Sequence, residues 1–204
     1  MSTDADLLAA TIGARVKHER QARGWTLDQL SDAAGVSRRM VVNVEQGAAN
    51  PSIATLLRLS DALGVGLPAL VEPPHTHGGK VTRRGDGAVL WTGEHGGRGV
   101  LVAGTASLDV VELWDWTLEA GDSLSSEPHA PGTKELLQVL SGQLTVTVAG
   151  EPFTLGAGDA LSFSGDVEHS YANPGQDTTR FSLSVFEPGV GAGHLNPAHR
   201  TVAP

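Results

Sequence analysis

The N-terminal third of the chain carries apolar residues at helical spacing. From Leu7 to about Arg23 they recur every three or four positions, with basic residues on the other faces and Gly24 at the end. This pattern predicts an amphipathic helix. Cap residues and apolar stripes predict further helices over Leu27–Ala34, from Ser37 to about Gln46, from Pro51-Ser52 to Gly64, and over Leu67–Val71.

The spacing changes after this helical region. Residues 72–79 mix Pro, Gly and His and are predicted to be a linker, and residues 80–188 consist of short β-prone runs separated by Gly, Asp and Pro turns. Such a succession is typical of a β-sandwich or barrel. The sequence therefore predicts an all-α domain over 1–71, an all-β domain over 80–188, and a Gly/Pro-rich tail over 189–204.

Composition removes several classes of site. The chain has no cysteine, which excludes disulfides, thiolate zinc sites and cysteine nucleophiles, so a metal would need His and carboxylate ligands. The acidic start MSTDADLL lacks the pattern of a signal peptide, and no apolar run approaches the ~18 residues of a membrane span. We expect a cytoplasmic protein without a membrane partner.

Charge is distributed unevenly along the chain. Residues 1–75 carry seven Lys and Arg against eight Asp and Glu, whereas residues 76–204 carry seven against fifteen. The second region therefore holds most of the net charge of −9. A nearly neutral first region is compatible with nucleic-acid binding, because a clustered basic face matters more than the total.

The segment TLDQLSDAAGVSRRMVVNVEQG reads as a helix, a glycine-containing turn and a second helix. Together with R-x-x-R-G-W-T-L before it and N-P-S after it, the stretch from Ile12 to Val65 resembles the Xre/Cro family of helix-turn-helix repressors. The resemblance implies binding to double-stranded operator DNA, with the N-terminal end of the third helix in the major groove.

Packing of the third helix selects its outward residues. Val41 and Val44 should pack inward with Val36, which leaves four residues on the outer face: Arg38, Arg39, Val42 and Asn43. Arg can bond guanine, Asn can bond adenine, and Val can contact a thymine methyl group. Four polar residues at helix starts or in a loop suit phosphate contacts, although a helix cap or a solvated position explains each equally well: Thr26, Gln29, Ser37 and Asn50.

Two stretches of the β region resemble the paired motifs of the cupin family. They are GDSLSSEPHAPGTKELLQVLSG, from Gly121 to Gly142, and GDALSFSGDVEHSYAN, from Gly158 to Asn173. The resemblance implies a double-stranded β-helix, or small β-barrel, with a central ligand site. Two departures affect the ligands, because Glu127 replaces the first histidine of the motif and five residues separate His129 from Glu135.

Two interpretations of the site follow. If the APGTK insert loops out, Glu127, His129, Glu135 and His169 form a set suited to Zn²⁺, Mn²⁺ or Fe²⁺; otherwise the barrel holds a pocket without metal. Glu127 and His129 should share one face if the chain there is extended. His75 and His77, in the linker, are expected to be solvated. The aromatic residues expected to line or cap the pocket are Trp114, Trp116, Phe163, Tyr171 and Phe181.

A helix-turn-helix region followed by a cupin-like region resembles the Xre-cupin regulators. The two resemblances predict a homodimeric, sequence-specific DNA-binding transcriptional regulator, not an enzyme, whose cupin domain senses a small-molecule effector, with or without a bound divalent metal. Two alternatives are a metal-dependent cupin dioxygenase or isomerase carrying a DNA-binding domain, and a DNA binder without an effector. Metal analysis and substrate turnover would separate the enzyme from the regulator.

Overall fold

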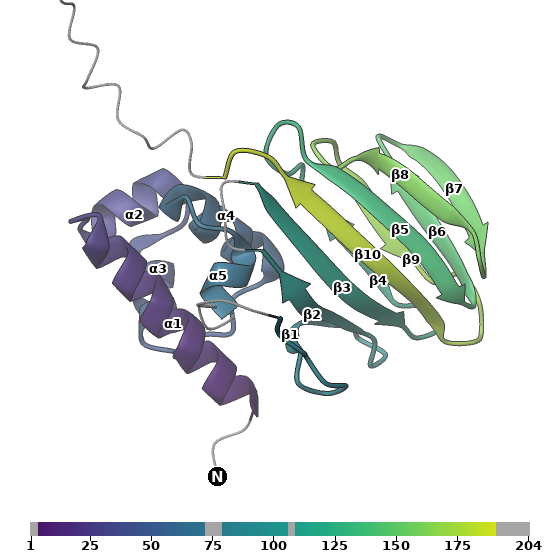
Figure 1. The fold of residues 1–204 in the computed structure, drawn as a ribbon, viewed down its shortest axis with the longest axis horizontal. Helices are drawn as coiled ribbons and strands as arrows, with labels where there is room; N and C mark the ends of the chain where they lie inside the picture. The colour runs from purple at the N-terminus through teal and green to yellow at the C-terminus, as the bar shows by residue number, and fades with distance from the viewer. Residues whose placement is uncertain (1–3, 72–78, 106–108, 191–204) are drawn as a thin grey trace, which may run out of the picture.

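The computed structural model describes residues 4–71, 79–105 and 109–190. A helical domain lies beside a barrel of two antiparallel sheets (Figure 1), so the predicted order of an all-α domain followed by an all-β domain is confirmed. Residues 72–78 of the predicted linker, with His75 and His77, and residues 191–204 of the predicted tail lie outside the described ranges.

The helical domain contains five helices at the predicted places. They are α1 (Asp4–Ala22), α2 (Leu27–Ala34), α3 (Arg38–Glu45), α4 (Ile53–Leu63) and α5 (Leu67–Val71). Three of them begin at a hydroxyl cap, since the side chains of Thr26, Ser37 and Ser52 each accept a backbone N–H from the first turn. Gly35 and Gly64 end α2 and α4 in the left-handed conformation, with φ of 61° at both.

Helices α1 and α3 pack closely. A Cβ atom on Gly13 would lie 2.3 Å from the carbonyl oxygen of Val44, so only glycine permits this approach. Arg20 of α1 forms two hydrogen bonds with Glu45 of α3, from Nε at 2.6 Å and from Nη2 at 2.8 Å. A bidentate, half-buried pair of this kind fixes the orientation of α3 against α1.

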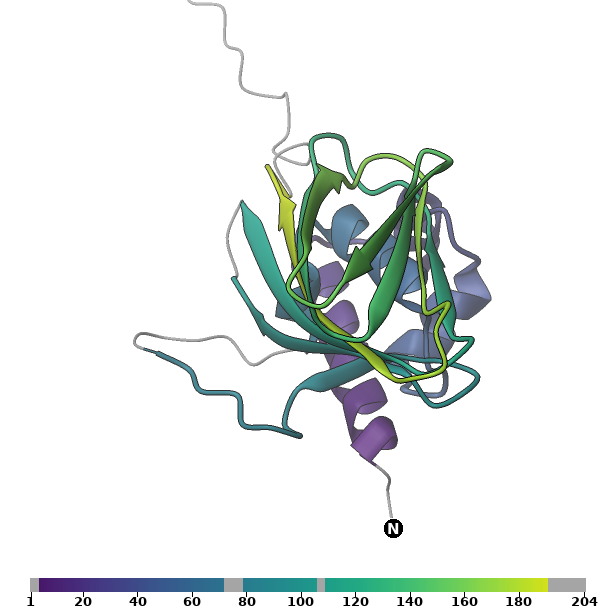
Figure 2. The same cartoon turned by 90° about the vertical axis from the view of Figure 1, so that its right-hand side faces the viewer.

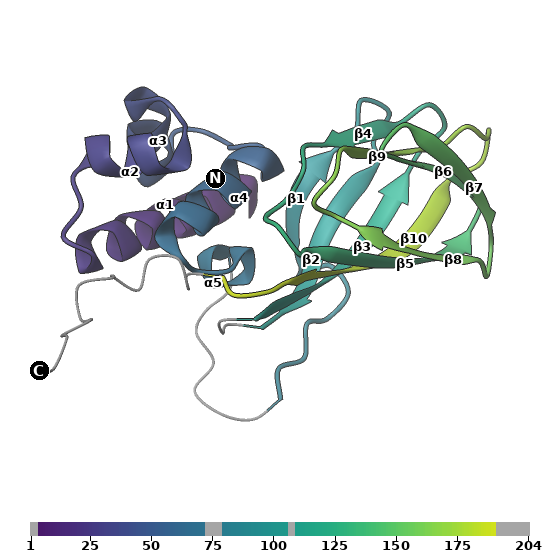
Figure 3. The same cartoon turned by 90° about the horizontal axis from the view of Figure 1, so that it is seen from above.

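The described residues of the second domain, 79–105 and 109–190, form ten strands in two sheets. The strands are β1 (Ala88–Thr92), β2 (Arg98–Gly104), β3 (Val110–Leu118), β4 (Ser123–Ser126), β5 (Lys134–Ser141), β6 (Gln143–Val148), β7 (Glu151–Gly156), β8 (Ala160–Ser164), β9 (His169–Ala172) and β10 (Thr179–Glu187). The six-stranded sheet has the order β1-β2-β3-β10-β5-β8, and the four-stranded sheet has the order β4-β9-β6-β7. The two sheets face each other across the barrel interior (Figures 2 and 3).

Strict alternation along the central strands decides which side chains enter the barrel. On β3, Glu112, Trp114 and Trp116 are buried, whereas Val111 and Leu113 are exposed on the outer face. The inward set of β10 is Phe181, Leu183, Val185 and Glu187. A period of two therefore places two glutamates, as well as aromatic and aliphatic residues, inside the barrel.

The two domains contact each other directly. Helix α5 packs on β2 so closely that a Cβ atom on Gly104 would lie 2.1 Å from Cγ of Pro68. Elsewhere, the guanidinium of Arg58 on α4 pairs with the carboxylate of Glu127, which follows β4. Figure 3 shows the start of α4 near the end of the barrel formed by β1 and β4.

Candidate DNA-reading helix and barrel cavity

The outer face of α3 is polar at its N-terminal end. Val41 and Val44 are buried, with exposures of 0% and 1%, which leaves Arg38 and Arg39 exposed and Val42 and Asn43 half-buried. Arg38 pairs with Asp28 of α2 through Nε and Oδ1 at 2.9 Å, with both side chains exposed. Exposed ion pairs contribute little to stability, so Arg38 can exchange this partner for a base or a phosphate.

The predicted phosphate-contacting residues lie beside this face. Thr26 and Gln29 form a capping box, in which each side chain accepts the backbone N–H of the other residue, at 3.1 and 2.8 Å. Ser37 caps α3 by accepting the N–H of Met40 at 3.1 Å. Asn50 is exposed in the loop between α3 and α4. The structure thus gives three of these residues capping roles at the start of α2 and α3, where backbone N–H groups also face solvent.

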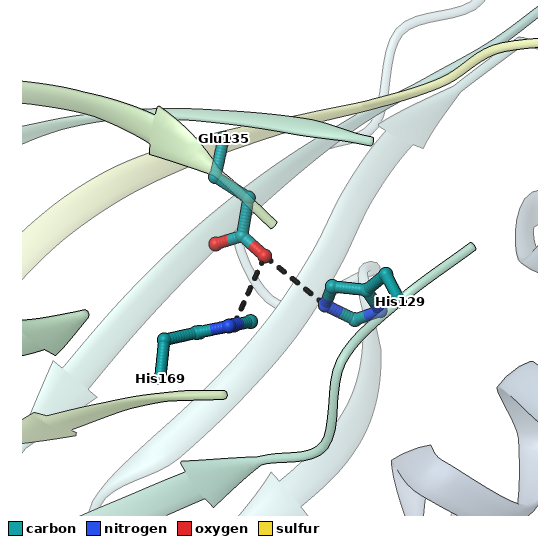
Figure 4. Close-up of side chains that lie close together, drawn as sticks. All are labelled: His129, Glu135 and His169. Atoms are coloured by element: carbon teal, nitrogen blue, oxygen red, sulfur yellow. Dashed lines mark ion pairs between the residues drawn. The ribbon is translucent and has the colours of Figure 1, made fainter. Parts of the chain in front are cut away.

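Three of the four predicted ligand residues meet inside the barrel. Glu135 of β5 places Oε1 3.0 Å from Nε2 of His129 and 3.2 Å from Nε2 of His169 on β9 (Figure 4). One ligand atom from each residue lies within 4.8 Å of the others. Two imidazoles and one carboxylate facing a common point form a donor set that suits Fe²⁺, Mn²⁺ or Zn²⁺.

The orientation of His169 fits a metal ligand. Its Nδ1 lies 2.7 Å from the carbonyl oxygen of Val167, which requires a proton on Nδ1. The opposite nitrogen, Nε2, is buried and has no hydrogen-bond partner among the described residues. In the neutral ring this nitrogen presents a lone pair toward Glu135 Oε1, and a cation between them would satisfy both acceptors.

The groups around Glu135 hold it in its ionised form. Burial by itself raises the pKa of this carboxyl, but the adjacent imidazoles of His129 and His169 outweigh burial and lower the pKa to about 2. The hydroxyl of Tyr171 donates to the second carboxylate oxygen and fixes its orientation. Burial by itself lowers the pKa of the His169 imidazole, but the adjacent Glu135 carboxylate stabilises the protonated ring, outweighs burial and raises the pKa.

Glu127 does not join the other three residues. Strand β4 ends at Ser126, and Pro128 follows, so Glu127 and His129 lie outside any strand, although both line the cavity described below. The Glu127 side chain is 65% exposed and pairs with Arg58, at the rim of the barrel. The structure thus pairs Glu127 with Arg58 instead of placing its carboxylate beside Glu135. The insert before Glu135 does loop out, as a turn at residues 130–132, and Glu135 faces inward.

A cavity of about 330 Å³ connects this cluster with the helical domain. Its barrel wall includes three aromatic residues, Trp114, Trp116 and Tyr171, and four glutamates, Glu112, Glu127, Glu135 and Glu187. The loop before α4 and the first two turns of α4 close the cavity on the other side, through Asn50, Pro51, Ser52, Ile53, Ala54 and Leu57. The volume is within the range of small-molecule sites, roughly 300–1,000 Å³.

The aromatic residues predicted for the pocket divide into two groups. Trp114, Trp116 and Tyr171 line the cavity, as expected. Phe181 is fully buried behind Trp116, with ring centroids 5.9 Å apart, and Phe163 packs its edge against His169 at 5.3 Å; neither ring lines this cavity.

The sequence interpretation missed two acidic residues of the cavity wall, Glu112 and Glu187. Both occupy inward positions of the alternating runs SLDVVELWDWTL and RFSLSVFEP, so strand periodicity alone could have identified them. Burial, followed by the negative charge of Glu187, raises the pKa of Glu112 to about 8. Burial also raises the pKa of Glu187.

Two family models match the chain, a helix-turn-helix over residues 16–70 and a cupin domain over residues 114–186. The chain is also 31% identical to the HTH-type transcriptional regulator SutR of Escherichia coli K12, over 181 residues covering 89% of this chain and 97% of the relative. The chain belongs to the Xre-type helix-turn-helix regulators with a cupin domain.

Another relative and a solved structure also match this Xre-cupin protein over most of its length. The HTH-type transcriptional regulator PuuR of E. coli is 24% identical over 166 residues, covering 79% of this chain and 86% of the relative. The crystal structure of an HTH_3 family transcriptional regulator from Vibrio cholerae has a TM-score of 0.70 at 23% identity, covering 90% of this chain and 99% of that one, and shows the shared fold.

The family assignment confirms the main functional prediction. This Xre-cupin protein is a DNA-binding transcriptional regulator. Among residues 4–71, 79–105 and 109–190, no helix is long and apolar enough to cross a membrane.

Proposed function

We propose that this regulator reads an operator with α3 and that the barrel cavity binds a small-molecule effector that sets operator affinity. The observation that carries the proposal is the composition of the cavity wall. The loop after the reading helix lines this cavity from Asn50 to Ser52. The cluster of His129, Glu135 and His169 lines the same cavity from the barrel. A molecule in the cavity would contact both domains.

Contact with both domains supplies a physical route for control. The first residues of α4 that line the cavity are joined to α3 by the short segment 46–52, and Ala48 N–H donates to the carbonyl oxygen of Asn43 on α3 at 2.9 Å. An effector that favours one arrangement of this segment changes the placement of α3. A ligand shifts such an equilibrium only by its difference in affinity for the two arrangements.

We assign base contacts to Arg38, Arg39, Val42 and Asn43, which form the outward face of α3. Thr26, Gln29, Ser37 and Asn50 are assigned to phosphate contacts. The support is their position around the N-terminal ends of α2 and α3, where polar side chains and backbone N–H groups suit phosphate oxygens.

We further propose that His129, Glu135 and His169 hold a divalent metal, Zn²⁺, Mn²⁺ or Fe²⁺. The support is the unpartnered buried Nε2 of His169 and the short distances to Glu135. A bound metal would supply a Lewis-acidic point for a polar group of the effector. Glu127, which pairs with Arg58 at the rim, is assigned to the contact between the domains instead.

A cupin enzyme is the second candidate, because three protein ligands leave positions open on a metal, as an oxygenase requires. We favour a regulator without turnover, since the relatives matched over most of their length are transcriptional regulators. Consumption of a candidate effector by the metal-loaded protein would reverse this choice.

We expect the regulator to act as a homodimer. The outer face of the six-stranded sheet exposes Val111 and Leu113 on β3 and Leu136 and Leu140 on β5, and apolar side chains gathered on one face favour association. A dimer presents two copies of α3 to DNA.

The expected result of genome-wide binding-site mapping is a small set of sites with twofold symmetry. Their half-sites should be spaced by one helical turn, roughly 34 Å, because a dimer places its two reading helices that far apart. Light scattering at micromolar concentration should give twice the mass of the 21.1 kDa chain. A monomer with and without operator, or binding without sequence preference, would contradict the proposal.

A further inference from the structure

The inner surface of the barrel contains a second acidic position, apart from the histidine cluster. Glu112 on β3 is 2% exposed. Its Oε2 accepts the indole N–H of Trp114 at 2.9 Å, whereas Oε1 is buried and has no partner among the described residues. A buried carboxylate oxygen without a partner is costly, which makes this oxygen an unfilled acceptor in the wall of the cavity.

The strand register locates Glu112 relative to the other carboxylates. Val185 of β10 pairs with Glu112 on one side and with Glu135 on the other, so these three inward residues form one row across β3, β10 and β5. Strands lie about 4.8 Å apart, which separates the Cα atoms of Glu112 and Glu135 by roughly 10 Å. Glu187 lies two residues beyond Val185 on β10, on the same inner face.

The charge of the cavity wall is one-sided. Four glutamates line the cavity, and among the described residues that line it there is no Lys or Arg. Glu135 has the two histidines as partners, and Glu127 has Arg58. No described ion pair provides a cation for Glu112 or Glu187. Neither glutamate has a Lys or Arg partner among the described residues, and burial raises the pKa of each, so a cation placed beside them would draw both into the ionised form.

An independent feature of the wall also indicates a ligand. The indole nitrogen of Trp116, a residue that is 3% exposed, has no hydrogen-bond partner among the described residues. Trp114 and Trp116 stack with ring centroids 5.7 Å apart and line the same cavity. The wall thus combines apolar ring faces, an unused N–H donor and an unused carboxylate acceptor.

We propose that the effector is a small molecule with a protonated amine that docks at Glu112 and Glu187, with an apolar chain against Trp114 and Trp116. A hydroxyl or carbonyl oxygen on the same molecule would accept the N–H of Trp116. This inference rests on the proposed effector role of the cavity.

Physical chemistry favours an amine over the other candidates. An ammonium group supplies N–H donors for the unpartnered oxygen of Glu112 and the positive charge for both glutamates. Aromatic faces attract cations within ~6 Å, and the adjoining rings cover an alkyl chain. An anionic ligand at this position would meet two glutamates, and a neutral one would bring no positive charge to a pair whose ionisation burial opposes.

Three probes with one skeleton test the inference: 6-amino-1-hexanol, 1,6-hexanediol and 6-hydroxyhexanoate. Each has a hydroxyl at one end, and they differ only in a positive, neutral or negative group at the other. Their affinities for the full-length protein are measured by ligand-observed NMR. We expect the aminoalcohol to bind at least tenfold more tightly than the diol and the hydroxy acid.

Matched variants locate the amine. Glu112→Gln and Glu187→Gln keep the size of the side chain but remove its charge, and each should reduce aminoalcohol affinity about tenfold without changing diol affinity. Glu151→Gln, at an exposed position on β7 outside the cavity, should change neither. Retained folding of Glu112→Gln is checked by its thermal unfolding, because Trp114 donates to Glu112 and its fluorescence would respond to the substitution itself.

The outcomes separate this inference from the proposed function. Equal affinity for the three probes, no binding of any probe, or an unchanged aminoalcohol affinity in Glu112→Gln would overturn the amine, whatever operator measurements show. Selective aminoalcohol binding that is lost in Glu112→Gln supports the amine. If operator affinity then failed to respond to a saturating amine ligand, the proposed control of DNA binding would fail while the ligand class would stand.

Discussion

Replacing both Arg38 and Arg39 with alanine should abolish sequence-specific operator binding while leaving the fold intact. Both side chains are exposed on the outer face of α3, and neither supports the core formed by Val41 and Val44. An Arg that bonds a guanine edge contributes about 1–3 kcal/mol of discrimination, which corresponds to roughly 5- to 150-fold in affinity per residue. Fluorescence anisotropy on the mapped operator and on a scrambled duplex measures the loss.

The control for this experiment is Arg98→Ala, which removes an exposed cation from β2 on the barrel. It should leave operator affinity within about twofold, since a rim or distant charge has little effect at physiological salt. Asn43→Ala should relax the preference at one base pair. Operator affinity that is unchanged in the double arginine variant would remove α3 as the reading helix.

The second large effect is expected for the histidine cluster. His129→Ala and His169→Ala should each abolish binding of Zn²⁺, Mn²⁺ or Fe²⁺, because a site with three ligands that loses one imidazole keeps only two. The wild-type melting temperature should rise on addition of the metal, since a ligand at 100 times its Kd stabilises the folded state by about 2.7 kcal/mol. Neither histidine variant should show this rise.

Glu127→Ala is the matched control for the metal, because its carboxylate lies at the rim and pairs with Arg58 rather than with the cluster. Metal content by elemental analysis should be unchanged in this variant. Wild-type protein that contains no metal and gains no thermal stability from any of the three ions would contradict the metal proposal and leave a cavity that recognises its ligand with organic groups alone.

The helical domain could be predicted closely because its signals are local. Thr26, Ser37 and Ser52 are caps that act within one turn, and Gly35 and Gly64 end helices through their own φ angles. Strands β1 and β4 have weaker local signals. AVLWT is a short run among glycines and SLSS is mostly polar, and each becomes a strand only by pairing with a distant partner, β2 and β9 respectively.

In the site, too, residues within local motifs could be predicted from the sequence, whereas contacts between distant segments could not. The cupin-like motifs identify His129, Glu135 and His169, and the structure brings them together. The pairing of Glu127 could not be predicted, because its partner Arg58 belongs to another domain and no local pattern reports that contact. For the same reason, the helical residues that close the cavity could not be predicted. Glu112 was within reach of a periodicity argument, since it occupies an inward position of β3.

The central claim, that the state of the barrel controls the reading helix, is tested most directly by a charge exchange at the contact between the domains. Glu127→Arg opposes Arg58 with a second cation and should change operator affinity at least threefold, in either direction, because α4 and its preceding loop are displaced from the cavity.

Operator affinity is measured by anisotropy for the wild type, Glu127→Arg, and the exchanged pair Arg58→Glu with Glu127→Arg. Glu151→Arg is included as a control with the same charge change on the exposed part of β7. We expect an altered affinity for Glu127→Arg, a return to the wild-type value in the exchanged pair, and no comparable change in the control. Equal operator affinity for the wild type and Glu127→Arg would contradict the central claim.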